Sequence, residues 1–286
     1  MVEKFYICAA LYTLLGLLIG SFLNVVIHRL PIMIFKEYQA EADELDSLKL
    51  DLPKGSYNLM YPASSCPNCN NSIHPLHNIP VFSYLFLLGK CSYCKTSIAF
   101  RYPFVEILTA FLSLMVFIKF GLSMQAVVST ILVFSLVVIT FIDIDYKIIP
   151  NNISLPLLWL GLIANNYMMF TTLEDALFGA IFGYIILWST YWFYKLCTGK
   201  EGMGHGDFKL LAMFGAFFGY QAILPILLTS SISALIISFS LIAMRRLRIS
   251  QAFAYGPYIC FAGILYLFFA DSFFRLHYKL ILLLGV

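Results

Sequence analysis

The chain has 286 residues, of which 61% are hydrophobic, 17% aromatic and only 12% charged, and its formal net charge is +3. A soluble domain of this size carries about twice that fraction of charged residues, and its core could not bury so much apolar surface. The composition therefore excludes a soluble globular protein, a disordered chain and a DNA-binding domain. Together with a mean hydropathy of +0.86, it predicts an all-helical polytopic membrane protein that binds no nucleic acid.

A helix needs about 20 apolar residues to cross the hydrocarbon core of a bilayer. Apolar stretches that meet or approach this length predict about eight transmembrane helices, at 5–27, 103–118, 124–142, 153–170, 176–194, 208–218, 222–244 and 257–274. The sixth stretch is short and rich in glycine, so a half-helix, or a helix that begins in the preceding loop, is the alternative. The first stretch is too long and too weakly charged at its start to be a simple cleaved signal peptide.

The lysine and arginine residues are distributed unevenly between the loops. With the N-terminus outside, 14 of the 18 basic residues fall in inside loops, as is typical of cytoplasmic loops. We therefore predict a first transmembrane helix (1–29), a cytoplasmic domain (30–102) and a transmembrane domain (103–286). The acidic run at 36–49 is interpreted as a solvated surface helix without chemistry.

Four cysteines in the cytoplasmic domain have the spacing of a metal site. Cys66 with Cys69 and Cys91 with Cys94 form two CxxC pairs separated by 21 residues, and two such turns can close a four-thiolate shell around zinc. A reducing cytoplasm argues against disulfides, and a redox CxxC would need only one pair in a βαβ context. The pattern predicts a structural zinc site, with the intervening His74 or His77 as an alternative ligand.

Acidic residues at the edges of the apolar stretches are the candidates for chemistry, since ionisable groups are costly there. Glu106 lies one turn into the second stretch and is positioned to pair with Arg101, Lys209 or a substrate amine. Asp143 ends the third stretch, and Asp145 follows it as a surface or supporting residue. Asp207 begins the sixth stretch, after three glycines at alternate positions.

Asp143 and Asp207 fall at the same, cytoplasmic end of the predicted bundle although they are 64 positions apart. Two adjacent carboxylates cannot both ionise readily. One can then take a proton from water while the other donates to a peptide carbonyl, which is amide hydrolysis without metal or covalent intermediate. Two simpler readings stay open, namely a glycine-rich turn whose aspartate caps a helix, and acids solvated at the headgroups.

Several motifs in this order resemble the type IV prepilin peptidases, bacterial inner-membrane aspartic peptidases of the GxGD class. The resemblance covers nearly the whole chain. It rests on GSFLNVVIHRLP at 20–31, PASSCPNC at 62–69, NIP at 78–80, GKCSYC at 89–94, RYPFVE at 101–106, Asp143 with IPN at 149–151, GMGHGDFKL at 202–210 and GPY at 256–258.

The resemblance implies a peptidase whose catalytic residues are Asp143 and Asp207. Such enzymes cut the basic leader from type IV prepilins and type II secretion pseudopilins, after a glycine and usually before a phenylalanine. Forms with both CxxC pairs are associated with N-methylation of the new terminus by S-adenosylmethionine. No glycine-rich Rossmann fingerprint is present for that cofactor, so its binding residues are unassigned.

The departures from the family pattern are small and leave both aspartates in place. Asn151 stands where many relatives have aspartate, and Ala254-Tyr255 replaces the commoner Pro-Phe. Two rival functions follow from the residues. A transporter that relays ions predicts acids near mid-bilayer and two related halves, neither of which is seen. An inactive assembly scaffold would be expected to lose one aspartate.

Overall fold

The computed structural model describes residues 2–42, 57–244 and 253–284 of the chain. Helices make up the regular structure of these residues, apart from two isolated β-bridges. The chain divides into two compact units, Met1–Leu122 and Ser123–Val286. The first unit contains the four cysteines, and the second contains Asp143 and Asp207.

The first unit is built on two long helices, α1 (Val2–Ala42) and α3 (Arg101–Phe120), which pack against each other. The Asn24 side chain of α1 donates a hydrogen bond of 3.1 Å to the carbonyl of Tyr102 in α3. Between these helices the chain forms a small domain with a short 3-10 helix, η1 (Pro75–Asn78), and the single-turn helix α2 (Phe82–Phe86).

Helix α1 continues well past the predicted end of the first apolar stretch. It includes Pro31 and runs to Ala42, so the first residues of the predicted cytoplasmic domain prolong the membrane helix. Arg29, which is buried, donates to the carbonyls of Asn58, Leu59 and Pro62, and these bonds hold the returning chain against α1. Of the acidic run at 36–49, residues 43–49 lie outside the described residues.

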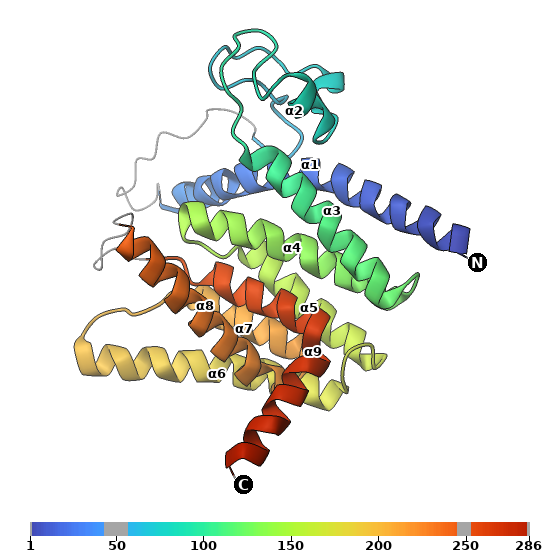
Figure 1. The fold of residues 1–286 in the computed structure, drawn as a ribbon. Coiled ribbons are helices and arrows are strands. Elements are labelled where there is room, and N and C mark those ends of the chain that lie inside the picture. Colours follow the sequence, from blue (N-terminus) through green and yellow to red (C-terminus); the bar gives the residue numbers. More distant parts are fainter. Residues whose placement is uncertain (1, 43–56, 245–252, 285–286) are drawn as a thin grey trace. The chain divides into compact units, whose positions relative to one another are not determined.

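The second unit is a helical bundle in which successive helices reverse direction (Figure 1). Its elements are α4 (Met124–Tyr146), α5 (Asn151–Asn166), α6 (Leu173–Thr198), α7 (His205–Phe218), η2 (Tyr220–Ala222), α8 (Ile223–Ala243) and α9 (Gly256–Leu284). Helix α7 forms the core, since its residues from Asp207 to Phe218 are buried except for Lys209 and it packs against α5, α6 and α9.

Each predicted apolar stretch forms a helix, but the helices differ in length. Within the described residues, five helical segments are long and apolar enough to cross a membrane, namely α1, α3, α4, α6 and Tyr220–Ala243. Helix α7 has 14 residues and begins at His205, inside the preceding glycine-rich loop. A buried helix is shielded from lipid by its neighbours, so it need not have the length of an isolated span.

The outer faces of α6 and α8 carry large apolar side chains that are exposed, among them Phe178, Ile185, Ile232 and Phe239. Soluble proteins rarely expose continuous apolar surface of this kind, whereas acyl chains solvate it readily. The protein is therefore a multi-pass membrane protein.

Candidate functional site

Asp143 lies in the last turn of α4 and is buried, with 4% of its surface exposed. The helix ends at Tyr146, and Lys147 caps it in a left-handed conformation with its N–H donating to the Asp143 carbonyl. The Asp143 carboxylate accepts a hydrogen bond from the backbone N–H of Gly256, at the start of α9. A Cβ atom at position 256 would lie 2.6 Å from Oδ2 of Asp143, so this approach requires glycine.

Asp207 is the third residue of α7, whose N-cap is Gly204. The backbone N–H of Gly204 donates to the Asp207 carboxylate, as in the side-chain half of a capping box. The interpretation of Asp207 as the N-cap is therefore wrong, because Gly204 is the N-cap and Asp207 lies in the first turn of the helix. The Asp207 side chain is 6% exposed and lies at the positive end of the helix dipole.

Ile149 brings three segments of the second unit together around these carboxylates. A Cβ at Gly206 would lie 2.8 Å from Cβ of Ile149, and one at Gly256 would lie 3.1 Å from its Cδ1. The loop after α4, the start of α7 and the start of α9 therefore converge. The carboxylates of Asp143 and Asp207 interact electrostatically with each other, so the predicted pair is brought together.

Three further polar residues of this region, Asp145, Asn151 and Lys209, have defined surroundings. Asp145 is exposed, in agreement with its interpretation as a surface residue. Lys209 donates a hydrogen bond of 2.8 Å to Oδ1 of Asn151. The residue that departs from the family pattern at position 151 therefore ties the start of α5 to the first turn of α7.

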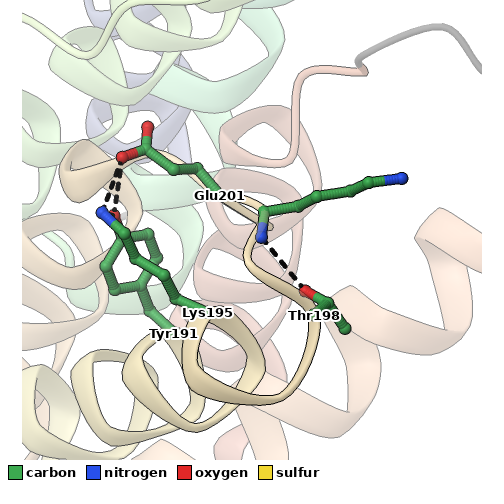
Figure 2. A network of polar contacts seen from close by, with 5 residues as sticks. Tyr191, Lys195, Thr198 and Glu201 are labelled. Atoms are coloured by element: carbon green, nitrogen blue, oxygen red, sulfur yellow. Dashed lines mark hydrogen bonds and ion pairs between the residues drawn. The ribbon is translucent and has the colours of Figure 1, made fainter.

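A polar network at the end of α6 holds the turn that leads to Asp207 (Figure 2). Oε1 of Glu201 accepts hydrogen bonds from Nζ of Lys195 at 2.9 Å and from the Tyr191 hydroxyl at 3.2 Å. The buried Tyr191 ring packs on His205, with 5.0 Å between centroids, and on Phe208 at 5.7 Å. Both residues flank Asp207, so the network orients the start of α7. No motif in the sequence pointed to it.

The four cysteines of the first unit form a cluster in which all four Sγ atoms lie within 4.8 Å of one another. The Sγ atoms of Cys66 and Cys94 are 3.7 Å apart. Tetrahedral zinc with Zn–S bonds of 2.3 Å has S···S edges of about 3.8 Å. The thiols therefore fit a tetrahedral zinc ion, while His74 and His77 are not members of the cluster.

The two cysteine turns have the same backbone pattern. In each, the residue after the second cysteine, Asn70 or Lys95, has a positive φ and donates its N–H to the carbonyl of the first cysteine. The first cysteine donates its own N–H to the carbonyl five residues on, that of Asn71 or Thr96. Two copies of one knuckle thus face each other, which is the usual construction of a structural zinc site.

The thiol electrostatics also favour a bound cation. The side-chain and backbone hydrogen bonds from Thr96 lower the pKa of Cys94 to about 5, and a backbone hydrogen bond from Cys69 lowers that of Cys66. The pKa of Cys69 rises to about 11, because burial and the neighbouring sulfur atoms outweigh the hydrogen bond from Asn71. Four neighbouring thiolates would repel one another. A divalent cation would offset this repulsion and allow all four thiolates to form.

Glu106 has a different partner from those expected. It is buried in α3 and its Oε2 accepts a hydrogen bond of 2.7 Å from the backbone N–H of Val81, with a further bond from the side chain of Ser21. The carboxylate therefore attaches the small domain to α3. Only the fold reveals this role, since nothing in the sequence pairs Glu106 with Val81.

Comparison with known proteins identifies the family. The bacterial peptidase A24 N-terminal domain matches residues 14–120, and the type IV leader peptidase family matches residues 130–239. The chain is 48% identical over 262 residues to a prepilin leader peptidase/N-methyltransferase of Pseudomonas aeruginosa, a match that covers 92% of this chain and 90% of that protein. The chain belongs to the prepilin leader peptidase family.

Other members of this family are nearly as similar. A prepilin leader peptidase/N-methyltransferase of Aeromonas salmonicida is 46% identical over 275 residues, covering 96% of this chain and 94% of the relative. One from Dichelobacter nodosus is 41% identical, with 87% of each chain covered. No solved structure matches the chain. The family-level resemblance predicted from the sequence motifs is thereby confirmed.

Proposed function

We propose that this prepilin leader peptidase cleaves the leader from type IV prepilins and type II secretion pseudopilins with Asp143 and Asp207 as its catalytic pair. The observation that carries the assignment is the convergence of both buried carboxylates at one end of the second unit. Family membership supplies the class of substrate. The electrostatic interaction between the two carboxylates supports their use as the acid–base pair that metal-free amide hydrolysis requires.

The mechanism uses one carboxylate as a base and its partner as an acid. The base takes a proton from a water molecule held between the two side chains, and the water oxygen attacks the scissile carbonyl. The acid donates its proton to the developing oxyanion. When the tetrahedral adduct breaks down, the carboxyl group that took the proton from water gives it to the leaving amine, and the other carboxylate takes back its proton from the hydroxyl of the adduct. The scissile segment has to unwind first, because a helical carbonyl is engaged in the intrahelical hydrogen bonds.

Gly206 and Gly256 allow close packing of the backbone beside the carboxylates. Ile149 lies in the space that a Cβ atom would take at both positions, and Oδ2 of Asp143 lies against Gly256. The Gly256 N–H also fixes the orientation of the Asp143 carboxylate, so that this side chain is positioned before substrate binds.

The topology in this proposal has about eight membrane helices with the N-terminus outside. The 14 basic residues on the inner side support it, as does the burial of α7 among longer helices. The domains are the first transmembrane helix (1–29), the cytoplasmic zinc domain (30–102) and the peptidase domain (103–286). In this arrangement the enzyme resides in the bacterial inner membrane and cleaves at the cytoplasmic face.

A zinc ion held by Cys66, Cys69, Cys91 and Cys94 stabilises the small domain in this proposal. The Sγ spacing and the paired knuckles support it. Four thiolates leave no position for a reactive water molecule, so the ion has a structural role. Residues 57–100 contain two isolated bridges, one short helix and one 3-10 turn, and a segment with so little secondary structure depends on the metal for its fold.

The names of the relatives are the basis on which we also propose N-methylation with S-adenosylmethionine. The described residues contain only isolated β-bridges, so they include no strand, glycine loop and helix of the Rossmann type. A Rossmann-type site therefore does not fit the described part of the chain, and we assign no residue to the methyl donor.

Mass spectrometry of a prepilin peptide incubated with purified protein tests the function. Cleavage after the glycine is expected with or without S-adenosylmethionine, and a mass increase of one methyl group on the product only with it. An intact peptide in both samples would reject the peptidase, and an ion-relay function would then have to be tested by flux in proteoliposomes. Cleavage without methylation would reject the methyltransferase activity and leave the peptidase activity supported.

A further inference from the structure

The segment 82–88 of the first unit carries four large apolar side chains that are mostly exposed. Phe82, Leu85, Phe86 and Leu88 are 67%, 62%, 92% and 83% exposed. In α2 the first three lie at i, i+3 and i+4, which places them on one face of the helical turn. We call these four side chains the α2 face.

The opposite side of this segment is fastened to the second cysteine knuckle. The Tyr84 hydroxyl donates to the carbonyl of Ile98 at 3.4 Å, and the N–H of Gly89 donates to the carbonyl of Tyr84 at 2.8 Å. The N–H of Ile98 returns a hydrogen bond of 2.7 Å to the carbonyl of Gly89. The α2 face is therefore presented by a fixed backbone, since its orientation follows from that of the knuckle.

The same segment is attached to a membrane-spanning helix at a defined depth. The N–H of Val81, directly before α2, donates to Glu106 at 2.7 Å. Glu106 is the sixth residue of α3, and α3 is long and apolar enough to span the bilayer. At 1.5 Å per residue, Glu106 lies about 7 Å along the axis from the first residue of the span. Headgroups and the upper acyl chains occupy this depth.

We propose that the α2 face inserts into the lipid of the leaflet in which α3 begins. We assign lipid as the partner of this face because the bond between Val81 and Glu106 holds it at the depth where α3 presents apolar surface to the membrane. Apolar side chains with aromatic members are typical of segments that lie in the interface. The exposed Lys90, two residues after Leu88, is placed to contact phosphate groups. Lipid insertion would hold the zinc domain against the membrane surface.

Tryptophan fluorescence in proteoliposomes tests this proposal in the full chain. The three natural tryptophans, Trp159, Trp188 and Trp192, are replaced by phenylalanine, and Phe86→Trp introduces the probe. In vesicles with dibrominated acyl chains, its emission should be blue-shifted and quenched about twofold relative to unbrominated vesicles, as for a side chain in the interfacial region. Zinc content and thermal melting show whether each variant is folded.

Met60→Trp provides the matched control. Met60 is apolar and 91% exposed in the same domain, but its turn contacts Arg29, which follows the apolar stretch 5–27 and ends the predicted first transmembrane helix. Its emission should match a water-exposed tryptophan and resist quenching by brominated lipid. If Phe86→Trp impairs folding, Leu88→Trp reports on the same face.

Two results would overturn the proposal. Emission from the Phe86→Trp and Leu88→Trp variants that is red-shifted like the control would place the face in water. Blue-shifted emission without quenching would show that protein, either another part of this chain or a second copy, covers the face instead of lipid. Neither outcome depends on peptidase activity, so the proposal stands or falls separately from the assigned function.

Discussion

The backbone N–H of Gly256 donates a hydrogen bond to the carboxylate of Asp143, and a Cβ at position 256 would come within 2.6 Å of its Oδ2. The start of α9 is thus part of the site, although 113 residues separate the two positions in the sequence. Any side chain at position 256 has to displace the carboxylate.

Replacing Gly256 by alanine is therefore expected to impair cleavage more than stability. The added methyl group would turn the Asp143 side chain away from Asp207, and misplacement of a catalytic group by about 1 Å can cost 10²-fold in rate. Peptide cleavage and thermal melting of the purified variant measure the two effects. A variant that cleaves at the wild-type rate would show that this contact does not position Asp143.

The glycines of the GxGD motif should differ in their tolerance of alanine. A Cβ at Gly206 would lie 2.8 Å from Cβ of Ile149, whereas the closest neighbour at Gly204 is Oδ2 of Asp207 at 3.7 Å. Overpacking of this kind costs about 1–3 kcal/mol, so Gly206→Ala should lower both the melting temperature and the cleavage rate. Gly204→Ala is the matched control and should retain a near-native melting temperature. Equal losses in both variants would contradict the steric account.

The Lys195–Glu201 pair should act on turnover through the position of the turn that precedes Asp207. Glu201→Gln and Lys195→Met are each expected to lower kcat about tenfold, since small displacements of catalytic groups are costly, with little change in KM. The exchanged pair, Lys195→Glu with Glu201→Lys, should recover part of the rate. Failure of the exchange together with an unchanged kcat in both single variants would exclude a positioning role.

The same pair predicts a pH effect with a defined sign. Hydrogen bonding to Lys195 lowers the pKa of Glu201 below its ordinary value. Its stabilisation of the turn is therefore complete above the pKa of an unperturbed glutamate, about 4.3, and is lost as the pH falls through the lowered pKa. The protection factors of the amides of residues 199–204, which are exchange rates corrected for the intrinsic effect of pH, should fall in that acidic range in the wild type. A fall of equal size in Glu201→Gln would assign the effect to another group.

Removal of the metal should unfold the small domain and leave the second unit intact. Cys66→Ser or a chelator should reduce the zinc content from about one ion per chain to near zero. Limited proteolysis should then increase between residues 57 and 100. Cys260→Ser is a control outside the cluster, because that buried cysteine lies in α9. Full zinc content in Cys66→Ser would contradict the four-thiolate site.

Much of the fold could be predicted from the sequence, because apolar stretches and cysteine spacing are local features of the chain. Apolar stretches predicted the helices, and CxxC spacing predicted the cysteine cluster that the structure contains. The orientation that the basic residues indicate stays a prediction. The pairing of Asp143 with Asp207 followed from their positions at one end of the bundle. Among the described residues five helices are long and apolar enough to span. The larger number of about eight stays a prediction, since a buried helix such as α7 need not have the length of an isolated span.

The contacts that depend on packing could not be predicted in the same way. Periodicity does not reveal that Gly256 bonds to Asp143, that Val81 bonds to Glu106 or that Tyr191 and Lys195 share one oxygen of Glu201. Each of these contacts involves a residue in a loop or at the start of a helix, and tertiary structure sets the position of that residue. Glu106 illustrates the point, since its predicted partners were all charged and its actual partner is an amide.

The catalytic role of the two aspartates is the central claim, and substitution by asparagine tests it most directly because asparagine preserves the shape of the side chain. Asp143→Asn and Asp207→Asn proteins are incubated with a prepilin peptide, and the product is quantified by mass spectrometry beside Asp145→Asn, which changes an exposed neighbour. We predict that each of the first two variants loses about 10²- to 10⁴-fold in cleavage rate with an unchanged melting temperature, while Asp145→Asn remains active. Wild-type cleavage by a folded Asp143→Asn or Asp207→Asn protein would contradict the account.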